Sequence, residues 1–423
     1  MDKIRVGVIG IDRGTSMIRY CESAQNAKVV AICDKWKEGL QRKKEEINDP
    51  NVTYYTDYDE FLKHDMDAVV LANYAIEHAP FAIKAMNAGK NVLSEVLPCQ
   101  TMKEAVELIE TVERTGKQYC YLENYCYLPA PREMKRMYEK GLIGEIEYAE
   151  GEYIHNCETI WTSITQGNPD HWRNNMYANY YCTHSIGPML HICGKRPVKV
   201  TGFELPYNDR ASRMGRKGAL VGVEMITLEN GAVLKSTHGG LDRNSIWYTV
   251  YGSKGRLESA RESVQNGGVE RIYTEYYDTE GEYDKLNSES YLPAERDDPE
   301  DVSKGFGHGG SDYFSMYNCI EKLRGNNSAD IIDVYEALSM SLCGMFAYRS
   351  VLNGGVPTEI PNLRNAEERD KWRNDTTCTD PKVAGDMLIP AYSKGNVNIP
   401  EEVYKMKQKE WHENSFSGAY WKK

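Results

Sequence analysis

The sequence predicts a doubly wound α/β domain with a parallel sheet, followed by an α+β domain with an open, mostly antiparallel sheet. Apolar runs alternate with helical segments at the start of the chain, and a glycine turn follows the first run. Later apolar runs succeed one another without helices between them. With 423 residues the chain has room for two sizeable cores. We expect domains at 1–124 and 125–360 and a C-terminal arm at 361–423.

The first 34 residues read as a strand, a glycine turn, a helix, a second strand and an acid, Asp34. This is the plan of a Rossmann-type dinucleotide-binding unit, in which the helix N-terminus faces a pyrophosphate and the acid binds the adenosine ribose. The pattern departs from Gly-x-Gly-x-x-Gly, because Asp12 stands at the second glycine position and Gly14 comes one residue early. A purely structural turn is the competing interpretation. Asp34 favours NAD, whereas the adjacent Lys35 keeps NADP open.

The alternation of strands and helices continues to about residue 124. We expect strands at 52–55, 68–72, 91–94 and 118–123, and helices at 36–47, 58–62, 79–88 and 102–115. Ligands of such sheets bind at the carboxyl ends of the strands. The predicted cofactor-binding residues lie there and in the glycine turn: Gly10, Asp12, Arg13, Gly14, Asp34, Asn73, His78, Glu95 and Asn124. Of these, His78 also suits a purely structural position at a helix start.

The second half of the chain predicts an antiparallel sheet with one covered face. The expected strands span 146–154, 198–205, 220–228, 232–238 and 246–252, and the expected helices lie near 132–139, 311–324 and 333–352. Residues 156–179 are poorly periodic and read as a loop over the site, and the charged tract 277–301 reads as a surface excursion. Because an uncovered sheet face usually meets a partner, we expect a homodimer or homotetramer.

Composition excludes several classes of function. A net charge of −12 argues against nucleic acid or an anionic membrane surface as the main partner. The sequence contains no run of 18 apolar residues, and its opening Met-Asp-Lys leaves no room for a signal peptide, so we expect a cytoplasmic protein. The 11 cysteines are scattered without a Cys-x-x-Cys pair, which favours reduced thiols and no metal site.

At Ala88–Glu95 the chain resembles the glucose–fructose oxidoreductase / inositol dehydrogenase (Gfo/Idh/MocA) family, over roughly residues 3–355. That family shares the two-domain plan, and its corresponding strand ends in Glu-Lys-Pro. Here Val96 stands at the position of the lysine that assists proton transfer in the family, and the proline has moved to Pro98. The departure argues against an ordinary sugar dehydrogenase mechanism.

One branch of that superfamily also lacks the lysine, namely the NAD-dependent glycosidases of glycoside hydrolase family 109. Several segments resemble that branch, in order Glu95-Val96, Leu122–Tyr127, Tyr153–Asn156, Trp172-Arg173, Tyr181–Pro188 and Gly307–Gly310 with Asp312. The resemblance implies a carbohydrate or glycoside substrate and NAD as a cofactor regenerated in each turnover. It also implies cleavage by transient oxidation at C3, elimination of the C1 group, water addition and re-reduction.

The residues make chemical sense independently of the family. Oxidation of a ring hydroxyl requires a base within hydrogen-bond reach of the O–H group. Imidazole titrates near neutral pH and tyrosine hydroxyls relay protons, so we predict His184, Tyr181 and Tyr127 as the catalytic residues. The predicted substrate-binding residues are Glu95, His155, Trp172, Arg173 and His308. Structural roles compete for several of them: a helix start for His184, a stacked pair for Trp172 and Arg173, and a glycine-rich turn for His308.

Three hypotheses for the function remain open at this stage. The first is the glycosidase described above. The second is a net NAD-dependent sugar or glycoside dehydrogenase that forms a 3-keto product, against which Val96 counts. The third is a non-catalytic nucleotide-binding sensor, which the altered glycine turn suggests. The sequence does not define the sugar, its anomer or the aglycone.

Overall fold

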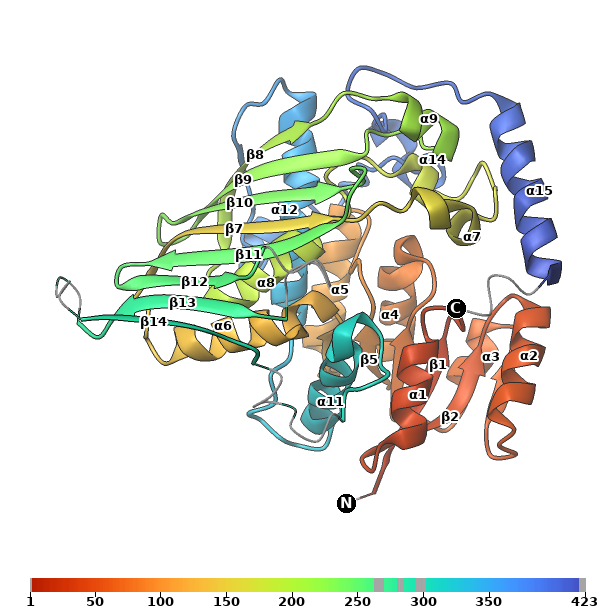
Figure 1. The fold of residues 1–423 in the computed structure, drawn as a ribbon. Helices are drawn as coiled ribbons and strands as arrows, with labels where there is room; N and C mark the ends of the chain where they lie inside the picture. The colour runs from red at the N-terminus through yellow and green to blue at the C-terminus, as the bar shows by residue number, and fades with distance from the viewer. Residues whose placement is uncertain are drawn as a thin grey trace.

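Two sheets form the framework of the molecule (Figure 1). The structure is a computed structural model and describes residues 2–261, 270–279, 281, 285–293, 298 and 302–417. The first sheet is parallel throughout, with strand order β3-β2-β1-β4-β5-β6. Its strands are β1 (Ile4–Ile9), β2 (Ala27–Cys33), β3 (Thr53–Tyr55), β4 (Ala68–Leu71), β5 (Asn91–Ser94) and β6 (Tyr119–Tyr121). The predicted doubly wound sheet is confirmed.

Helices connect the parallel strands because each crossover must return the chain to the same edge of the sheet. They are α1 (Thr15–Ser23), α2 (Lys37–Ile47), α3 (Tyr58–Leu62), α4 (His78–Asn87) and α5 (Met102–Thr115), with the short η1 (Ala75–Glu77) before α4. Helix α5 shows how local chemistry sets the bounds. Thr101 and Glu104 form a capping box at its start, and Gly116 ends it in the left-handed conformation at φ 64°.

The second sheet has nine strands in the order β14-β13-β12-β11-β7-β10-β9-β8-β15. Its strands are β7 (Ile146–Ile154), β8 (Pro197–Glu204), β9 (Val221–Leu228), β10 (Val233–Gly239), β11 (Ser245–Gly252), β12 (Gly255–Ser259), β13 (Ile272–Tyr277), β14 (Leu286–Tyr291) and β15 (Thr358–Glu359). All neighbours are antiparallel except β7 and β10, which are parallel. Strand β14 corrects the expected surface excursion at 277–301, because its backbone pairs with β13; part of that tract lies outside the described residues.

Helices cover one face of this second sheet (Figure 1). They are α6 (Pro129–Glu139), α8 (Thr183–Cys193) and α12 (Val334–Leu352). On the strands, Phe203, Met225 and Tyr251 are exposed and alternate with buried neighbours, so they mark the uncovered face. The expectation of a homo-oligomer through this face stays a prediction.

The remaining elements join the two sheets. The helix α11 (Ser311–Leu323), which follows η6 (His308–Gly310), packs on α1 of the first sheet, where Met316, Cys319 and Ile320 enter its core. The short elements are η2 (Asn124–Tyr127), η3 (Glu158–Ile160), α7 (Trp161–Thr165), η4 (Trp172–Asn175), α9 (Asp209–Met214), α13 (Ala366–Asp370), α14 (Pro381–Ala384) and η7 (Gly385–Met387). The last helix, α15 (Glu401–Ser417), packs on α7. Because α11 completes the first core, the expected division after residue 124 stays a proposal.

The cysteine side chains of this protein form no disulfide bonds. All 11 cysteines are free thiols, and ten of them are buried, as reduced core thiols would be. Within the described residues no helix combines the length and apolar character that crossing a membrane requires. The same residues contain no cluster of three or more histidine, cysteine or acidic side chains placed to hold a metal ion.

Candidate active site

The glycine turn after β1 is set by close backbone packing. Gly10 adopts φ 92°, and a Cβ atom there would lie 2.3 Å from the carbonyl oxygen of Ala72 at the end of β4. A Cβ atom on Gly14 would lie 2.3 Å from the Gly10 carbonyl. The Asp34 carboxylate accepts hydrogen bonds from the backbone N–H of Ile11 at 2.9 Å and of Trp36 at 2.8 Å. The unusual glycine spacing thus still forms a tight turn, held by the acid at the end of β2.

This turn has the features that a dinucleotide needs. Helix α1 begins directly after Gly14, and no side chain caps its first turn, so its N-terminus and positive dipole end are available to a pyrophosphate. Asp12 is exposed at the turn. Beside it, at the end of β4, the buried Oδ1 of Asn73 has no hydrogen-bond partner among the described residues. These features fit an adenine dinucleotide along the carboxyl ends of the first sheet.

Arg13 connects the glycine turn to the rest of the site. Its guanidinium lies 2.6 Å from Oε1 of Glu95 and forms two hydrogen bonds of 2.8 Å to the carboxylate of Asp312. Burial alone would lower the pKa of Arg13, but these two carboxylates raise it. Burial raises the pKa of Glu95 in spite of Arg13, whereas His308 and Arg13 hold the pKa of the buried Asp312 well below its usual range.

Asp312 also contacts two further predicted site residues, Asn124 and His308. It accepts a 2.9 Å hydrogen bond from Nδ2 of Asn124, the residue that follows β6 by three positions. The Nδ1 of His308 lies 3.3 Å from the same carboxylate. The start of α11 therefore brings Arg13, Asn124 and His308 together, although they are far apart in the sequence. The motif around Gly307 contains Asp312, yet the sequence did not indicate this role.

The central pair of the site is His184 with Glu123. Nδ1 of His184, in the first turn of α8, lies 2.5 Å from Oε1 of Glu123, which follows β6. Both side chains are buried. The hydroxyl of Tyr248 on β11 donates a 2.6 Å hydrogen bond to the His184 carbonyl and anchors this end of the helix. A carboxylate at Nδ1 fixes the ring and leaves Nε2 as the acceptor nitrogen, the arrangement of a general base.

Three tyrosine rings enclose His184. Their centroids lie 4.2 Å (Tyr125), 4.7 Å (Tyr153) and 5.2 Å (Tyr181) from the imidazole centroid. The hydroxyl of Tyr153 lies 2.9 Å from Nδ1 of His155, so the predicted substrate residue His155 belongs to the same cluster. Burial raises the pKa of all three tyrosines, so each hydroxyl keeps its proton at neutral pH.

Within the segment 156–179, which the sequence predicted as a loop over the site, His171 contacts the carboxyl end of the first sheet, whereas the earlier part forms η3 and α7 and packs on α15. The ring of His171 packs edge-on against Tyr74, just after β4, with centroids 4.9 Å apart. Burial, with the charges of Arg173 and Lys35, lowers the pKa of His171 to about 3. The Arg173 guanidinium lies 4.6 Å from the ring centroid of Trp172 and 4.9 Å from that of Tyr181. The predicted residues Trp172 and Arg173 thus adjoin the tyrosine cluster.

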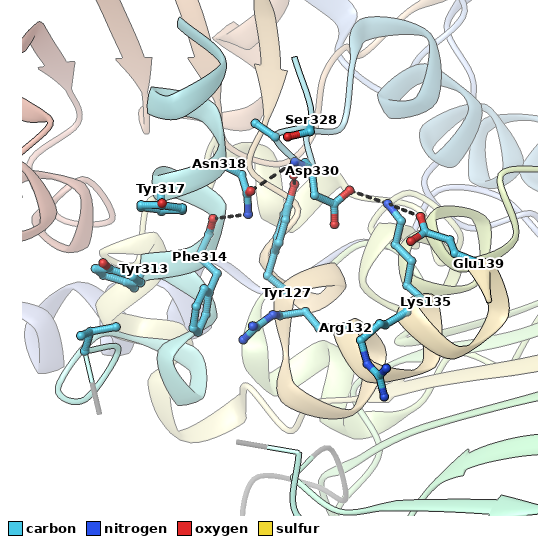
Figure 2. Close-up of a pocket in the computed structure, with 13 residues that line it drawn as sticks. Tyr127, Arg132, Lys135, Glu139, Tyr313, Phe314, Tyr317, Asn318, Ser328 and Asp330 are labelled. Atoms are coloured by element: carbon cyan, nitrogen blue, oxygen red, sulfur yellow. Dashed lines mark hydrogen bonds and ion pairs between the residues drawn. The ribbon is translucent and has the colours of Figure 1, made fainter. Parts of the chain in front are cut away.

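Two predicted residues lie apart from this cluster. Tyr127 is buried, and its hydroxyl donates a 2.9 Å hydrogen bond to the carbonyl of Asp330 beside Lys135 (Figure 2). It lines a separate groove of about 730 Å³ between α6 and α11. The ring nitrogens of buried His78 lie 2.8 Å from the Leu97 carbonyl and 3.3 Å from the Asn73 carbonyl, which is the structural position considered above. The structure places neither side chain against His184.

Sequence reasoning missed Glu123, Tyr125 and Tyr153. Glu123 is the last residue of the strand predicted at 118–123, so the rule that sites form at strand ends was a usable signal. Tyr125 and Tyr153 lie inside two of the quoted motifs but were not distinguished from the chain's 30 tyrosines. In each case the motif was noticed and the contacting residue was not.

Comparison with known proteins finds two family models that match separate parts of the chain. Residues 4–123 match the model of the oxidoreductase family with an NAD-binding Rossmann fold (Gfo/Idh/MocA), and residues 216–373 match the C-terminal domain of glycosyl hydrolase 109. A glycosyl hydrolase family 109 protein of Solibacter usitatus is 26% identical, over 88% of this chain and 89% of that protein. One from Shewanella sp. (strain W3-18-1) is 28% identical, over 88% and 87%.

Solved structures share the fold. An oxidoreductase from Agrobacterium radiobacter, in complex with NAD+, L-tartaric acid and magnesium, has a TM-score of 0.67 at 15% identity, over 85% of this chain and 99% of that one. A scyllo-inositol dehydrogenase from Lactobacillus casei, with bound NAD(H) and scyllo-inositol, has a TM-score of 0.63 at 16% identity, over 85% and 99%. The family resemblance seen in the sequence is confirmed.

Proposed function

We propose that the chain cleaves a glycoside by transient oxidation of the sugar, because residues 4–123 match the oxidoreductase family with an NAD-binding Rossmann fold and residues 216–373 match the C-terminal domain of glycosyl hydrolase 109. The observation that carries the proposal is the buried Glu123–His184 pair, enclosed by tyrosines and linked through Asn124, Asp312 and Arg13 to the glycine turn. A general base therefore stands beside the predicted cofactor site, where oxidation of a sugar hydroxyl requires it.

The residues that would hold NAD are those of the first sheet's carboxyl edge. The N-terminus of α1 would face the pyrophosphate, Asp34 the adenosine ribose, and Asn73 and Glu95 the nicotinamide half. When bound, NAD accepts a hydride from the sugar carbon and later returns it, so no net oxidation occurs. His78 supports this edge by fixing the segment between Asn73 and Leu97.

The chain's own residues would manage the protons. We assign to Nε2 of His184 the removal of the hydroxyl proton, while Glu123 holds Nδ1 and stabilises the imidazolium that results. A ketone at C3 acidifies the neighbouring C2 proton, which makes elimination of the C1 group feasible without an oxocarbenium ion. We assign to the buried hydroxyl of Tyr181 the transfer of its proton to the leaving group, and to the phenolate that remains the uptake of the C2 proton, so that the elimination is balanced in protons. We assign no proton transfer to Tyr127, because its hydroxyl is bonded to the Asp330 carbonyl.

An ordinary glycosidase mechanism fits the site less well. That mechanism uses two carboxyl groups flanking the scissile bond, one as acid and one as nucleophile or base. Here Glu95 is held by Arg13 and Glu123 by His184, so each carboxylate already has a partner. The oxidative route needs no such pair.

The test combines two measurements on the purified full-length protein. Mass analysis of nucleotide released on denaturation should identify NAD. A panel of 4-nitrophenyl glycosides with both anomers should give nitrophenol without a net rise in reduced-nicotinamide absorbance. Stoichiometric NADH accumulation with a 3-keto product would instead establish a net dehydrogenase. Failure to retain any nucleotide, with no activity on the panel, would leave the sensor hypothesis.

A further inference from the structure

Among the described residues, Arg173, which adjoins the tyrosine cluster, and Arg216, whose guanidinium lies 5.7 Å from the Trp161 ring centroid, have no acidic partner. Arg173 is partly exposed, and its guanidinium is held between the rings of Trp172 and Tyr181 rather than by a carboxylate. By contrast, Arg210 and Arg213, on nearby α9, are both paired with Glu158. An arginine flanked by two aromatic rings keeps the edge of its planar donor fork available to an anion.

Arg216 increases this local positive charge. It is 5% exposed, and one of its terminal nitrogens donates 3.0 Å hydrogen bonds to the carbonyls of Met176 and Ala219. Its buried Nε–H finds no acceptor among the described residues. Burial and the nearby charge of Arg173 lower the pKa of Arg216 to about 10, so it remains a cation at neutral pH. A buried guanidinium without a counter-ion is unfavourable unless an anion comes close.

The surroundings do not supply that anion. Burial, together with the charge of Arg173, lowers the pKa of His155, so this side chain is a neutral imidazole at pH 7 and not an anion. The two carboxylates nearest the tyrosine cluster, Glu95 and Glu123, are already paired with Arg13 and His184. Within the described residues, neither Arg173 nor Arg216 forms an ion pair with an acidic side chain. Arg173 and Arg216 are therefore two cations near the site without an acidic partner of their own among the described residues.

We propose that the substrate is a glycoside whose sugar bears an anionic oxygen group, as in a hexuronic acid, and that Arg173 binds this group with Arg216 behind it. This inference rests on the proposed function, because it names the substrate class of the same site. A carboxylate suits the single accessible guanidinium, which offers two parallel N–H donors. A sugar 6-phosphate presents the same chemistry, and the experiment separates the two sources.

The experiment measures sugar binding by isothermal titration calorimetry to the full-length protein saturated with NAD, so that the pyrophosphate site is already filled. The probes are glucose, galactose and mannose, each compared with its uronate and its 6-phosphate. We expect at least one anionic sugar to bind about 10- to 100-fold more tightly than its neutral partner, as a charge-assisted hydrogen-bonded contact would give. Arg173→Gln should abolish that preference, and Arg173→Lys should restore part of it.

Arg373→Gln serves as the matched control, because it removes a surface arginine that pairs with Glu110 on α5. It should leave the preference intact. Equal binding of neutral and anionic partners, an absence of binding by any anionic sugar, or a preference that survives Arg173→Gln would each overturn the inference. Nitrophenyl glycosides of the same sugars keep the two proposals apart. Cleavage of neutral glycosides without anion preference refutes only the substrate class, whereas anion preference without any cleavage refutes only the glycosidase.

Discussion

At the residue scale, the proposed chemistry depends on one contact, between the Glu123 carboxylate and the His184 imidazole. Glu123 is fully buried and uses Oε1 for His184, while its Oε2 has no hydrogen-bond partner among the described residues. In such a dry setting a hydrogen bond to a charged group is stronger than in water, and the ring orientation is fixed. The contact at Nδ1 therefore fixes the orientation and the tautomer of the His184 ring, and with them the position of Nε2.

We predict that Glu123→Gln lowers kcat by about 100- to 10,000-fold, because the amide neither stabilises the imidazolium nor selects the required tautomer. His184→Ala should abolish turnover. Both variants should retain nucleotide, as mass analysis of released nucleotide will show. Glu113→Gln, which alters a carboxylate paired with Arg369 on the surface of α5, is the control and should keep full activity. Turnover that survives His184→Ala would refute the assignment of the base.

At the scale of elements, α8 links the active site to a charged cluster at its other end. All 11 residues of this helix are buried. It approaches β7 so closely that a Cβ atom on Gly151 would lie 1.9 Å from the Ser185 carbonyl. His184 lies in its first turn, and His191 in its last turn contacts Glu336 at 2.6 Å and Lys135 at 2.9 Å. The helix is thus fixed by contacts at both ends.

His191 makes the stability of this helix depend on pH. Burial alone would lower the pKa of His191, but Glu336 and Asp330 raise it to about 9. A pKa raised above the unfolded value of 6.5 gives a stabilisation that is complete below about pH 6.5 and is lost as the pH rises through 9. The shift corresponds to roughly 3 kcal/mol in the free energy of unfolding.

We therefore predict that wild-type protein loses roughly 3 kcal/mol of unfolding free energy between pH 6.5 and 10, and His191→Gln much less. Urea unfolding at both pH values measures the difference. His412→Gln, on the exposed face of α15, should behave like wild type. Parallel losses in wild type and His191→Gln would show that the charged cluster does not control this pH dependence.

At the scale of the whole molecule, α11 joins the two halves. It buries Met316, Cys319 and Ile320 against the helix side of the first sheet. At the start of α11, the Asp312 carboxylate accepts hydrogen bonds from Arg13 in the glycine turn and from Asn124 after β6. The cofactor side and the substrate side of the site are therefore held in one geometry by a single buried carboxylate. Removal of the Asp312 carboxylate should therefore disturb both the cofactor side and the substrate side of the site.

We predict that Asp312→Asn lowers the free energy of unfolding at pH 7 by about 2 kcal/mol or more, because it leaves the partly buried Arg13 with Glu95 alone. Since the folded-state pKa of Asp312 is depressed, its stabilisation is present above the unfolded value of 3.8 and is lost as the pH falls below it. The gap between wild type and variant should therefore narrow in acid, as urea unfolding from pH 7 to pH 3 will measure. Asp65→Asn, on the exposed surface, should show no gap.

The sequence by itself determined the positions of most elements and the class of the fold. Alternating apolar runs, glycine stops and caps such as Thr101 act over a few residues, so they can be read locally, and the bounds of β7 and α5 were predicted to the residue. The strand-end rule also placed Asn73, Glu95 and Asn124 at one edge. The parallel pairing of β7 with β10 was not readable, because periodicity shows which face is buried and not which strand lies beside it.

The tertiary structure alone decided which side chains meet. Glu123 and His184 are 61 positions apart, and Arg13 and Asp312 are 299 apart, so no local pattern connects them. The same limit explains Tyr127, which shares a motif with Tyr125 yet contacts the Asp330 carbonyl, because a shift of two residues along a short helix changes the face on which a side chain lies. Contacts between distant segments follow from packing of the whole chain, which short-range sequence patterns do not encode.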